Sequence, residues 1–178
     1  MTKYIAFLRG INVGGHKPVK MEELKKAFEA MGFKNVKTLL ASGNVLFETP
    51  ETDTDNLIKR IEEELENELG HEIGVLLRTI EEIQSLVDAD PFKNIKVTPQ
   101  TRFYVTFLSE KPESTLKIPY ESIEKDIKIV QVSASEVCSF ITLSPIRGTS
   151  DLMSVLEKEF GRKVTTRNWN TVTRILKG

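Results

Sequence analysis

Two groups of polar and glycine residues have the composition of an anion-binding site. The first group consists of Arg9, Asn12, Gly14, Gly15 and His16, together with Ser42, Gly43 and Asn44 further along the chain. The second group consists of Arg147, Arg167, Asn168, Trp169 and Asn170. An arginine guanidinium offers a fork of donors that matches a carboxylate or a phosphate. Free N–H groups at a helix start also favour an anion, so both groups are candidate ligand-binding sites.

Each motif also has a purely structural interpretation. The pair Gly14-Gly15 has neither the spacing of a dinucleotide-binding fingerprint nor that of a P-loop, and paired glycines before a helix are common in turns. Ser42-Gly43-Asn44 is typical of a hairpin turn. Asn168 is a candidate helix N-cap, and Trp169 is a candidate core residue. Even so, the segment around them holds more polar side chains than capping requires.

The residues that could catalyse a reaction form no complete set. His16 beside Arg9 is a candidate acid and anion clamp, whereas a Ser42–His16 pair lacks a carboxylate that would orient the imidazole. Neither His16 nor His71 has further ligands at metal-binding spacing. Cys138 lies in a run typical of a buried strand. We therefore expect no metal site and no cofactor, and the sequence leaves open whether a reaction follows binding.

The elements that would position these residues occur in the same order in both halves of the chain. Apolar runs predict strands over residues 4–8, 36–40, 45–47 and 73–77, then over 103–107, 127–132, 137–143 and 163–166. Helical periodicity predicts helices over residues 21–31, 57–69 and 79–87, then over 112–120, 152–160 and 172–176.

Each half therefore follows the order β-α-β-β-α-β with a trailing helix, which predicts an α+β protein of two tandem ferredoxin-like (α-β plait) halves. We place the halves at residues 1–90 and 91–178, since the prolines near the junction interrupt periodicity. The order suggests a duplication, although no residue-level repeat between the halves is evident. The predicted topology brings the loop after strand 4–8 to the turn near Gly43, and the loop holding Arg147 to the segment holding Arg167.

Composition narrows the class of protein. The 178 residues carry a net charge of −1, divided into +4 over residues 1–50, −10 over 51–90 and +5 over 91–178. No apolar run has the roughly 20 residues of a membrane span, and a single cysteine favours the cytoplasm.

The strand at 44–48 lacks the aromatic motif of RNA-recognition modules, which disfavours nucleic acid as a partner. The strand at 4–8 is apolar on both faces and should be covered on both. A homo-oligomer is compatible with the sequence.

Three segments, taken in order, resemble the characteristic blocks of the family called domain of unknown function 1697. They are Leu8-Arg9-Gly10-Ile11-Asn12-Val13-Gly14-Gly15, then Ser42-Gly43-Asn44-Val45, then Asn168-Trp169-Asn170-Thr171-Val172. The resemblance covers nearly the whole chain and implies two ferredoxin-like halves. It implies no particular activity.

Three hypotheses for function follow. The preferred one is binding of an anionic, phosphate-bearing small ligand at one or both polar groups. The second is nucleic-acid binding through the basic segments. The third is a structural or interaction module in which Arg167, Asn168, Trp169 and Asn170 lock the two halves together. A guanidinium of Arg167 that is buried and paired within the protein would favour the third.

Overall fold

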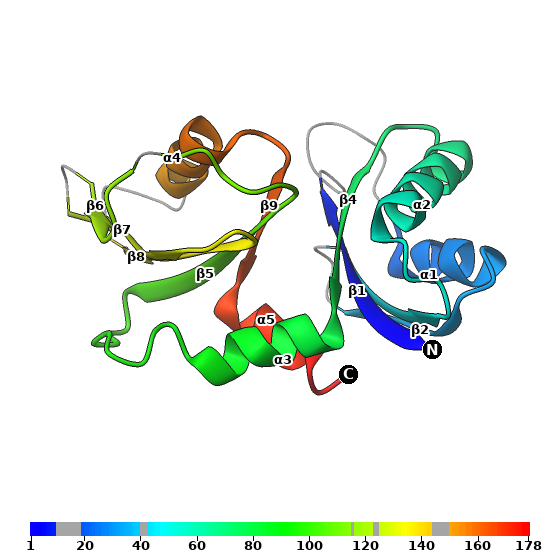
Figure 1. The fold of residues 1–178 in the computed structure, drawn as a ribbon, viewed down its shortest axis with the longest axis horizontal. Coiled ribbons are helices and arrows are strands. Elements are labelled where there is room, and N and C mark those ends of the chain that lie inside the picture. The colour runs from blue at the N-terminus through cyan, green and yellow to red at the C-terminus, as the bar shows by residue number, and fades with distance from the viewer. Residues whose placement is uncertain (10–18, 40–42, 115, 123–124, 144–149) are drawn as a thin grey trace. The chain divides into compact units, whose positions relative to one another are not determined.

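The computed structural model of the chain describes residues 1–9, 19–39, 43–114, 116–122, 125–143 and 150–178 (Figure 1). These residues form an α+β fold with two antiparallel sheets and five helices. The first sheet contains β1 (Thr2–Arg9), β2 (Lys34–Leu39), β3 (Asn44–Thr49) and β4 (Gly74–Thr79). The second contains β5 (Thr101–Leu108), β6 (Tyr120–Glu121), β7 (Ile127–Val132), β8 (Glu136–Thr142) and β9 (Val164–Asn168). The helices are α1 (Met21–Ala30), α2 (Thr54–Leu69), α3 (Ile80–Ala89), α4 (Ser150–Phe160) and α5 (Trp169–Ile175).

The chain divides into two compact units, each built around one sheet. The first unit comprises Met1–Ser85 and Thr173–Gly178, and the second comprises Leu86–Val172. Two helices therefore contribute residues to both units: α3 begins in the first and ends in the second, and α5 begins in the second and ends in the first. The division of the chain at residue 90 stays a prediction.

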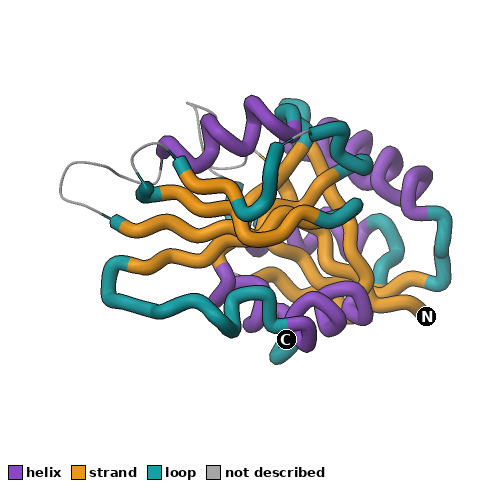
Figure 2. Tube along the Cα trace, turned by 60° about the vertical axis from the view of Figure 1, so that its left-hand side comes forward, coloured by secondary structure: helices purple, strands orange, loops and turns teal. Residues whose placement is uncertain are grey.

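The first sheet has the strand order β2-β3-β1-β4, and every neighbouring pair is antiparallel. Strand β3 therefore lies between β1 and β2, as the sequence predicts for this half. Helices α1 and α2 cover one face of the sheet (Figure 1). Figure 2 distinguishes the helices, strands and loops of the chain by colour. The side chain of Asp53 accepts a hydrogen bond from Asn56 N and caps α2 at its start. Gly70, with a φ of 79°, ends that helix in the left-handed conformation that favours glycine.

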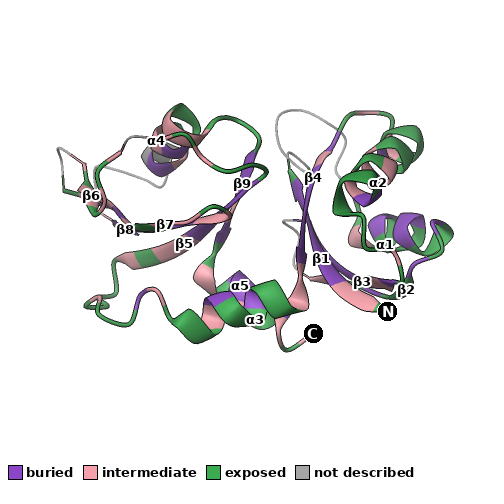
Figure 3. Cartoon of the chain, in the orientation of Figure 1, coloured by how far each residue is buried: buried purple, intermediate pink, exposed green. Residues whose placement is uncertain are grey.

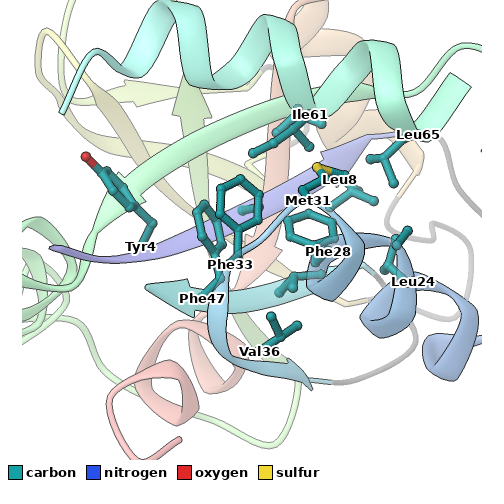
Figure 4. Packing of buried hydrophobic residues seen from close by; sticks show 14 of the residues in the cluster. Tyr4, Leu8, Leu24, Phe28, Met31, Phe33, Val36, Phe47, Ile61 and Leu65 are labelled. Carbon is teal, nitrogen blue, oxygen red and sulfur yellow. The ribbon is translucent and has the colours of Figure 1, made fainter. Parts of the chain in front are cut away.

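The core of the first unit lies between this sheet and the two helices (Figure 4). It contains the alternate residues Tyr4, Ala6 and Leu8 of β1. The ring of Phe28 from α1 lies 5.6 Å from that of Phe47 on β3, measured between centroids. Since these side chains are removed from water, the large apolar ones, such as Leu8, Phe28 and Phe47, each contribute on the order of 1.5–3 kcal/mol to folding.

The opposite face of the first sheet is buried as well, and Figure 3 shows most of β1 in the colour of buried residues. Ile5 and Phe7, which alternate with the residues of the core, are fully buried. The expectation that residues 4–8 are covered on both faces is therefore confirmed. The end of the chain supplies part of this cover, because the backbone of Gly178 lies against the side chains of Leu39 and Leu46.

The second sheet has the strand order β6-β7-β8-β5-β9 and is antiparallel throughout. Helix α4 packs on one face through Leu152 and Leu156, which join a cluster with Val137 and Ile141 of β8. The predicted helix over residues 112–120 is wrong. The described residues there are extended or bent, and the two-residue strand β6 pairs with β7 instead. Pro119 contributes to this, because a proline disfavours helical backbone in the residue before it, here Ile118.

The two units match in register as well as in strand order. Strand β2 carries an irregularity in its pairing with β3, and strand β7 carries one in its pairing with β8. The backbone N–H of Leu8 donates to the residue before β3 at 2.8 Å, and that of Leu108 donates to the residue before β8 at 2.9 Å. This correspondence aligns residues 4–8 with 104–108, of which three in five are identical.

The last strand of each unit ends in the same local arrangement. A buried arginine is followed by a capping residue and a helix: Arg78 and Thr79 precede α3, and Arg167 and Asn168 precede α5. Each arginine donates from Nη1 to the carbonyl of the residue before it, at 2.8 Å and 3.0 Å respectively. No residue-level repeat is evident from the sequence alone, and this short correspondence appears only when the strands are aligned by their pairing. The signal was too short to find without the register.

Replacing Phe28 with alanine tests the core of the first unit. The fully buried ring contacts Phe33 and Phe47, so its loss leaves a cavity and should lower the free energy of unfolding by about 3–5 kcal/mol. Urea denaturation followed by circular dichroism measures the change. Val97→Ala is the control, because Val97 is 66% exposed. An unchanged unfolding midpoint for Phe28→Ala would contradict this account of the core.

Candidate functional site

The described members of the first polar group lie together at one end of the first sheet. Arg9 is the exposed last residue of β1. The N–H of Leu8 donates to the carbonyl of Gly43 at 2.8 Å, and Phe7 is paired with Asn44. The end of β1 therefore adjoins Gly43 and Asn44, as expected, whereas the loop that follows β1 lies outside the described residues. Five further members lie outside the described residues: Asn12, Gly14, Gly15, His16 and Ser42.

Gly43 and Asn44 form part of a tight connection between β2 and β3. Gly43 has a φ of 84°, which favours glycine. The side chain of Asn44 is fully buried, and its Nδ2 donates to the carbonyl of Leu39 at 2.9 Å. The amide of Asn44 thus closes the connection across its base, in agreement with the hairpin interpretation of this motif.

Arg9 is an exposed cationic side chain at this end of the sheet. It is paired with Gly74 at the start of β4, and its Nε lies 3.7 Å from the place that a Cβ on that glycine would take. No ion pair joins Arg9 to any residue that the structure describes. Because α1 leads from β1 back to β2, its N-terminus lies at this same end, and Lys20 supplies no side-chain cap there.

Sequence reasoning missed Gly74. It lies in an apolar strand, where a glycine carries no pattern that points to a site, and only the pairing of β1 with β4 brings it beside Arg9. The acidic residues Glu22 and Glu23 were also left out of the group, although they occupy the first turn of α1. They make the local charge mixed rather than uniformly positive.

In the second polar group, Arg167 is buried in β9 and bonded within its own unit. Its Nη1 donates to Thr165 Oγ1 at 2.7 Å and to the carbonyl of Thr166 at 3.0 Å. Burial lowers the pKa of the guanidinium to about 10, because desolvation disfavours its charged form. Arg147, expected beside it, lies outside the described residues.

The neighbours of Arg167 make contacts that begin and anchor a helix. Oδ1 of Asn168 accepts hydrogen bonds from the N–H of Thr171 at 2.8 Å and from its hydroxyl at 3.0 Å, so Asn168 is the N-cap of α5. The ring of Trp169 meets that of Phe92 edge-on at 5.2 Å between centroids. Asn170 is exposed. These contacts favour the structural interpretation of the segment, including the burial and pairing of Arg167 that it required.

Metal and nucleophile chemistry have little support in the described part of the chain. No group of three or more His, Cys, Asp or Glu side chains is placed to hold a metal ion there. Nδ1 of His71 lies 3.2 Å from the carbonyl of Leu69, so this histidine is engaged at the end of α2. Cys138 is fully buried in β8, and burial together with the charge of Glu136 raises the pKa of its thiol to about 12.

Cys138 should therefore react slowly in the folded protein. The thiolate is the nucleophile, and at pH 8 a thiol with a pKa near 12 is almost entirely protonated. We expect an aromatic disulfide reagent to modify Cys138 at least about a hundredfold more slowly in the native protein than in denaturant, where the pKa is ordinary. Absorbance of the released thiolate measures both rates. Equal rates would contradict the burial of this side chain.

Arg167→Ala tests the structural interpretation of the second group. Removing the guanidinium leaves Thr165 and the carbonyl of Thr166 without their bonds inside the protein. We expect the free energy of unfolding to fall by about 1–3 kcal/mol. The control is Arg174→Ala, since Arg174 lies on the same chain segment but is exposed. If the two variants are equally stable, Arg167 has no special structural role.

The fold and this end of the sheet define a class: an α+β protein of two antiparallel-sheet units, with glycine residues and an exposed arginine where β1 ends. The family described as "Protein of unknown function (DUF1697)" matches residues 1–137. The chain belongs to this family, as the three sequence blocks indicate.

A comparison with solved structures finds the same fold in a bacterial protein. "The structure of conserved bacterial protein SP0830 from Streptococcus pneumoniae" matches with a TM-score of 0.69 and 20% sequence identity. The match covers 99% of this chain and 97% of that one. No curated protein matches. Among the described residues, none of the helices combines the length and hydropathy that a membrane span requires.

Proposed function

We propose that the protein binds a small anionic ligand that carries a phosphate, at the end of the first sheet where β1 terminates. The observation that carries this proposal is the exposed guanidinium of Arg9, which has no acidic partner among the described residues. An arginine is suited to a phosphate because its parallel N–H groups match two phosphate oxygens.

The surroundings of Arg9 suit a close approach of such a ligand. Gly43 and Gly74 flank it on the neighbouring strands and present backbone without side chains. The N-terminus of α1 lies at the same end and has no side-chain cap, so its N–H groups favour negative charge. The predicted group also includes His16 and Ser42, which lie outside the described residues.

The charges at this end favour a compact anion over a polyanion. Glu22 and Glu23 lie in the first turn of α1. Helix α2 also ends here, because it leads to Gly74 of β4, and its last turns carry exposed Glu66 and Glu68. A nucleic acid would meet these carboxylates along its backbone, whereas one phosphate can meet Arg9 alone. Nucleic-acid binding thus remains the weaker alternative.

Arg9→Ala tests the proposal. Losing a charge-assisted hydrogen bond typically costs about 1.5–3 kcal/mol, which corresponds to a Kd roughly tenfold or more higher. Isothermal titration with inorganic phosphate and with nucleoside monophosphates measures the effect. Arg162→Ala is a matched control, since Arg162 is an exposed arginine of the second unit.

Three outcomes distinguish the hypotheses. Weaker binding by Arg9→Ala but not by Arg162→Ala supports the proposed site. Equal weakening in both would point to nonspecific attraction. Tighter binding of short RNA than of monophosphates, with affinity that falls steeply with salt, would favour the nucleic-acid alternative. If binding is established, replacing His16 or Ser42 with alanine tests whether either group also catalyses a reaction.

A second candidate function is structural, and the distribution of α3 and α5 between the units favours it. Each helix starts directly after the last strand of one unit and contributes its final residues to the other. We propose that Arg167, Asn168, Trp169 and Asn170 set the start of α5 and so lock the two halves of the chain together. Arg167→Ala then lowers stability without changing the affinity for phosphate.

We also infer that the two units arose by duplication of one ferredoxin-like plait. The support is the shared strand order, the matching irregularity in register, and the repeated arrangement of a buried arginine before a capped helix. In the second unit, a loop and β6 replace the first helix of the pattern.

A further inference from the structure

We propose that residues 173–178, here called the C-terminal strap, regulate the anion site by bracing the hairpin beside it. This inference rests on the proposed function, because it names a control of that same site. The strap belongs to the first compact unit, although α5, from which it continues, begins in the second. Residues 173–178 therefore belong to the first unit although they follow the second along the chain.

The strap is seated on the face of the first sheet that α1 and α2 leave uncovered. A Cβ on Gly178 would lie 2.8 Å from Cδ1 of Leu46 and 3.4 Å from Cδ1 of Leu39. Leu46 is only 1% exposed, so it has little room to move away. Nζ of Lys3 also donates to the carbonyl of Gly178 at 3.3 Å. Ile175, just before the strap's last turn, is buried.

Leu39 and Leu46, the two leucines that contact Gly178, lie on the paired strands β2 and β3 of the hairpin whose turn adjoins Leu8. Leu39 ends β2, and its carbonyl accepts the hydrogen bond from Asn44 that closes the connection. The carbonyl of Gly43, within this connection, accepts the N–H of Leu8 next to Arg9. A shift of Leu39 or Leu46 would thus move the backbone that flanks the proposed ligand site.

Seating of the strap and binding of the ligand should be coupled through this hairpin. If a seated strap raises the affinity for phosphate by holding the hairpin in its binding conformation, bound phosphate must raise the equilibrium constant for seating the strap by the same factor. Such coupling between two binding events is reciprocal. The start of α5, with the cap made by Asn168, lies only a few residues before the strap. The second unit therefore has a direct covalent route to the site in the first.

Gly178→Val tests the coupling. The added side chain meets Leu46, so the strap should lose its seat and inorganic phosphate should bind about fivefold or more weakly, the usual size of such coupling. Isothermal titration gives the Kd. Hydrogen exchange of the backbone amides of Lys177 and Gly178, which bond to Arg174 and Ile175 within the strap, reports how well the strap is ordered, and an unseated strap should exchange faster. Saturating phosphate should slow this exchange in the unaltered protein.

Two further variants serve as a control and as a milder perturbation of the strap. Lys177→Val places the same residue type one position earlier, where the side chain is exposed, and should change neither affinity nor exchange. Lys3→Met removes only the hydrogen bond to Gly178 and should shift both in the direction of Gly178→Val, by a smaller factor. Far-ultraviolet circular dichroism confirms that each variant is folded.

The outcomes separate this inference from the function on which it rests. If the unaltered protein does not bind phosphate, both the proposed function and the strap inference fail. If it binds phosphate, and Gly178→Val loosens the strap without changing the Kd, only the inference is overturned. Weaker binding in Gly178→Val and Lys3→Met, with slower exchange of the strap on adding phosphate, supports both.

Discussion

The burial of β1 on both faces and both edges is the constraint on which the first unit depends. The strand pairs with β3 on one side and β4 on the other, and residues 4–8 are nearly inaccessible to water. A strand of this kind can be stable only if both faces are covered, because each exposed Phe or Leu would forfeit about 1.5–3 kcal/mol. Helices α1 and α2 cover one face, and the end of the chain contributes to the cover of the other.

The same constraint explains why the candidate site lies where β1 ends. Burial stops abruptly between Leu8, 1% exposed, and Arg9, which faces solvent. The antiparallel neighbours β3 and β4 start where β1 stops. Gly43 and Gly74, which are distant in the sequence, therefore both lie beside the end of β1. A charged residue there keeps its hydration or gains a ligand, whereas one residue earlier it would be desolvated.

The polar segment at residues 167–170 has the composition of an anion-binding site, but its described contacts stabilise the protein itself. Arg167 holds a hydroxyl and a carbonyl of its own strand, Asn168 caps the helix that follows, and Trp169 packs on Phe92. Arg78 makes the corresponding backbone bond in the first unit. The same bond therefore occurs at the strand-to-helix junction of both units.

The sequence by itself determined the strands, most helices, their order in the first half, and the double burial of residues 4–8, because these depend on local periodicity and on propensity. It also made Arg9 a candidate ligand-binding residue and contained the three segments that resemble the family. Only the tertiary structure decided that residues 112–120 are not helical, that Arg167 is buried, and that residues 173–178 join the first unit. Strand register, burial and long-range packing depend on partners far along the chain, and no local pattern encodes a partner. Arg9 and Arg167 are the same residue type, and it is their long-range packing that leaves the first exposed and buries the second.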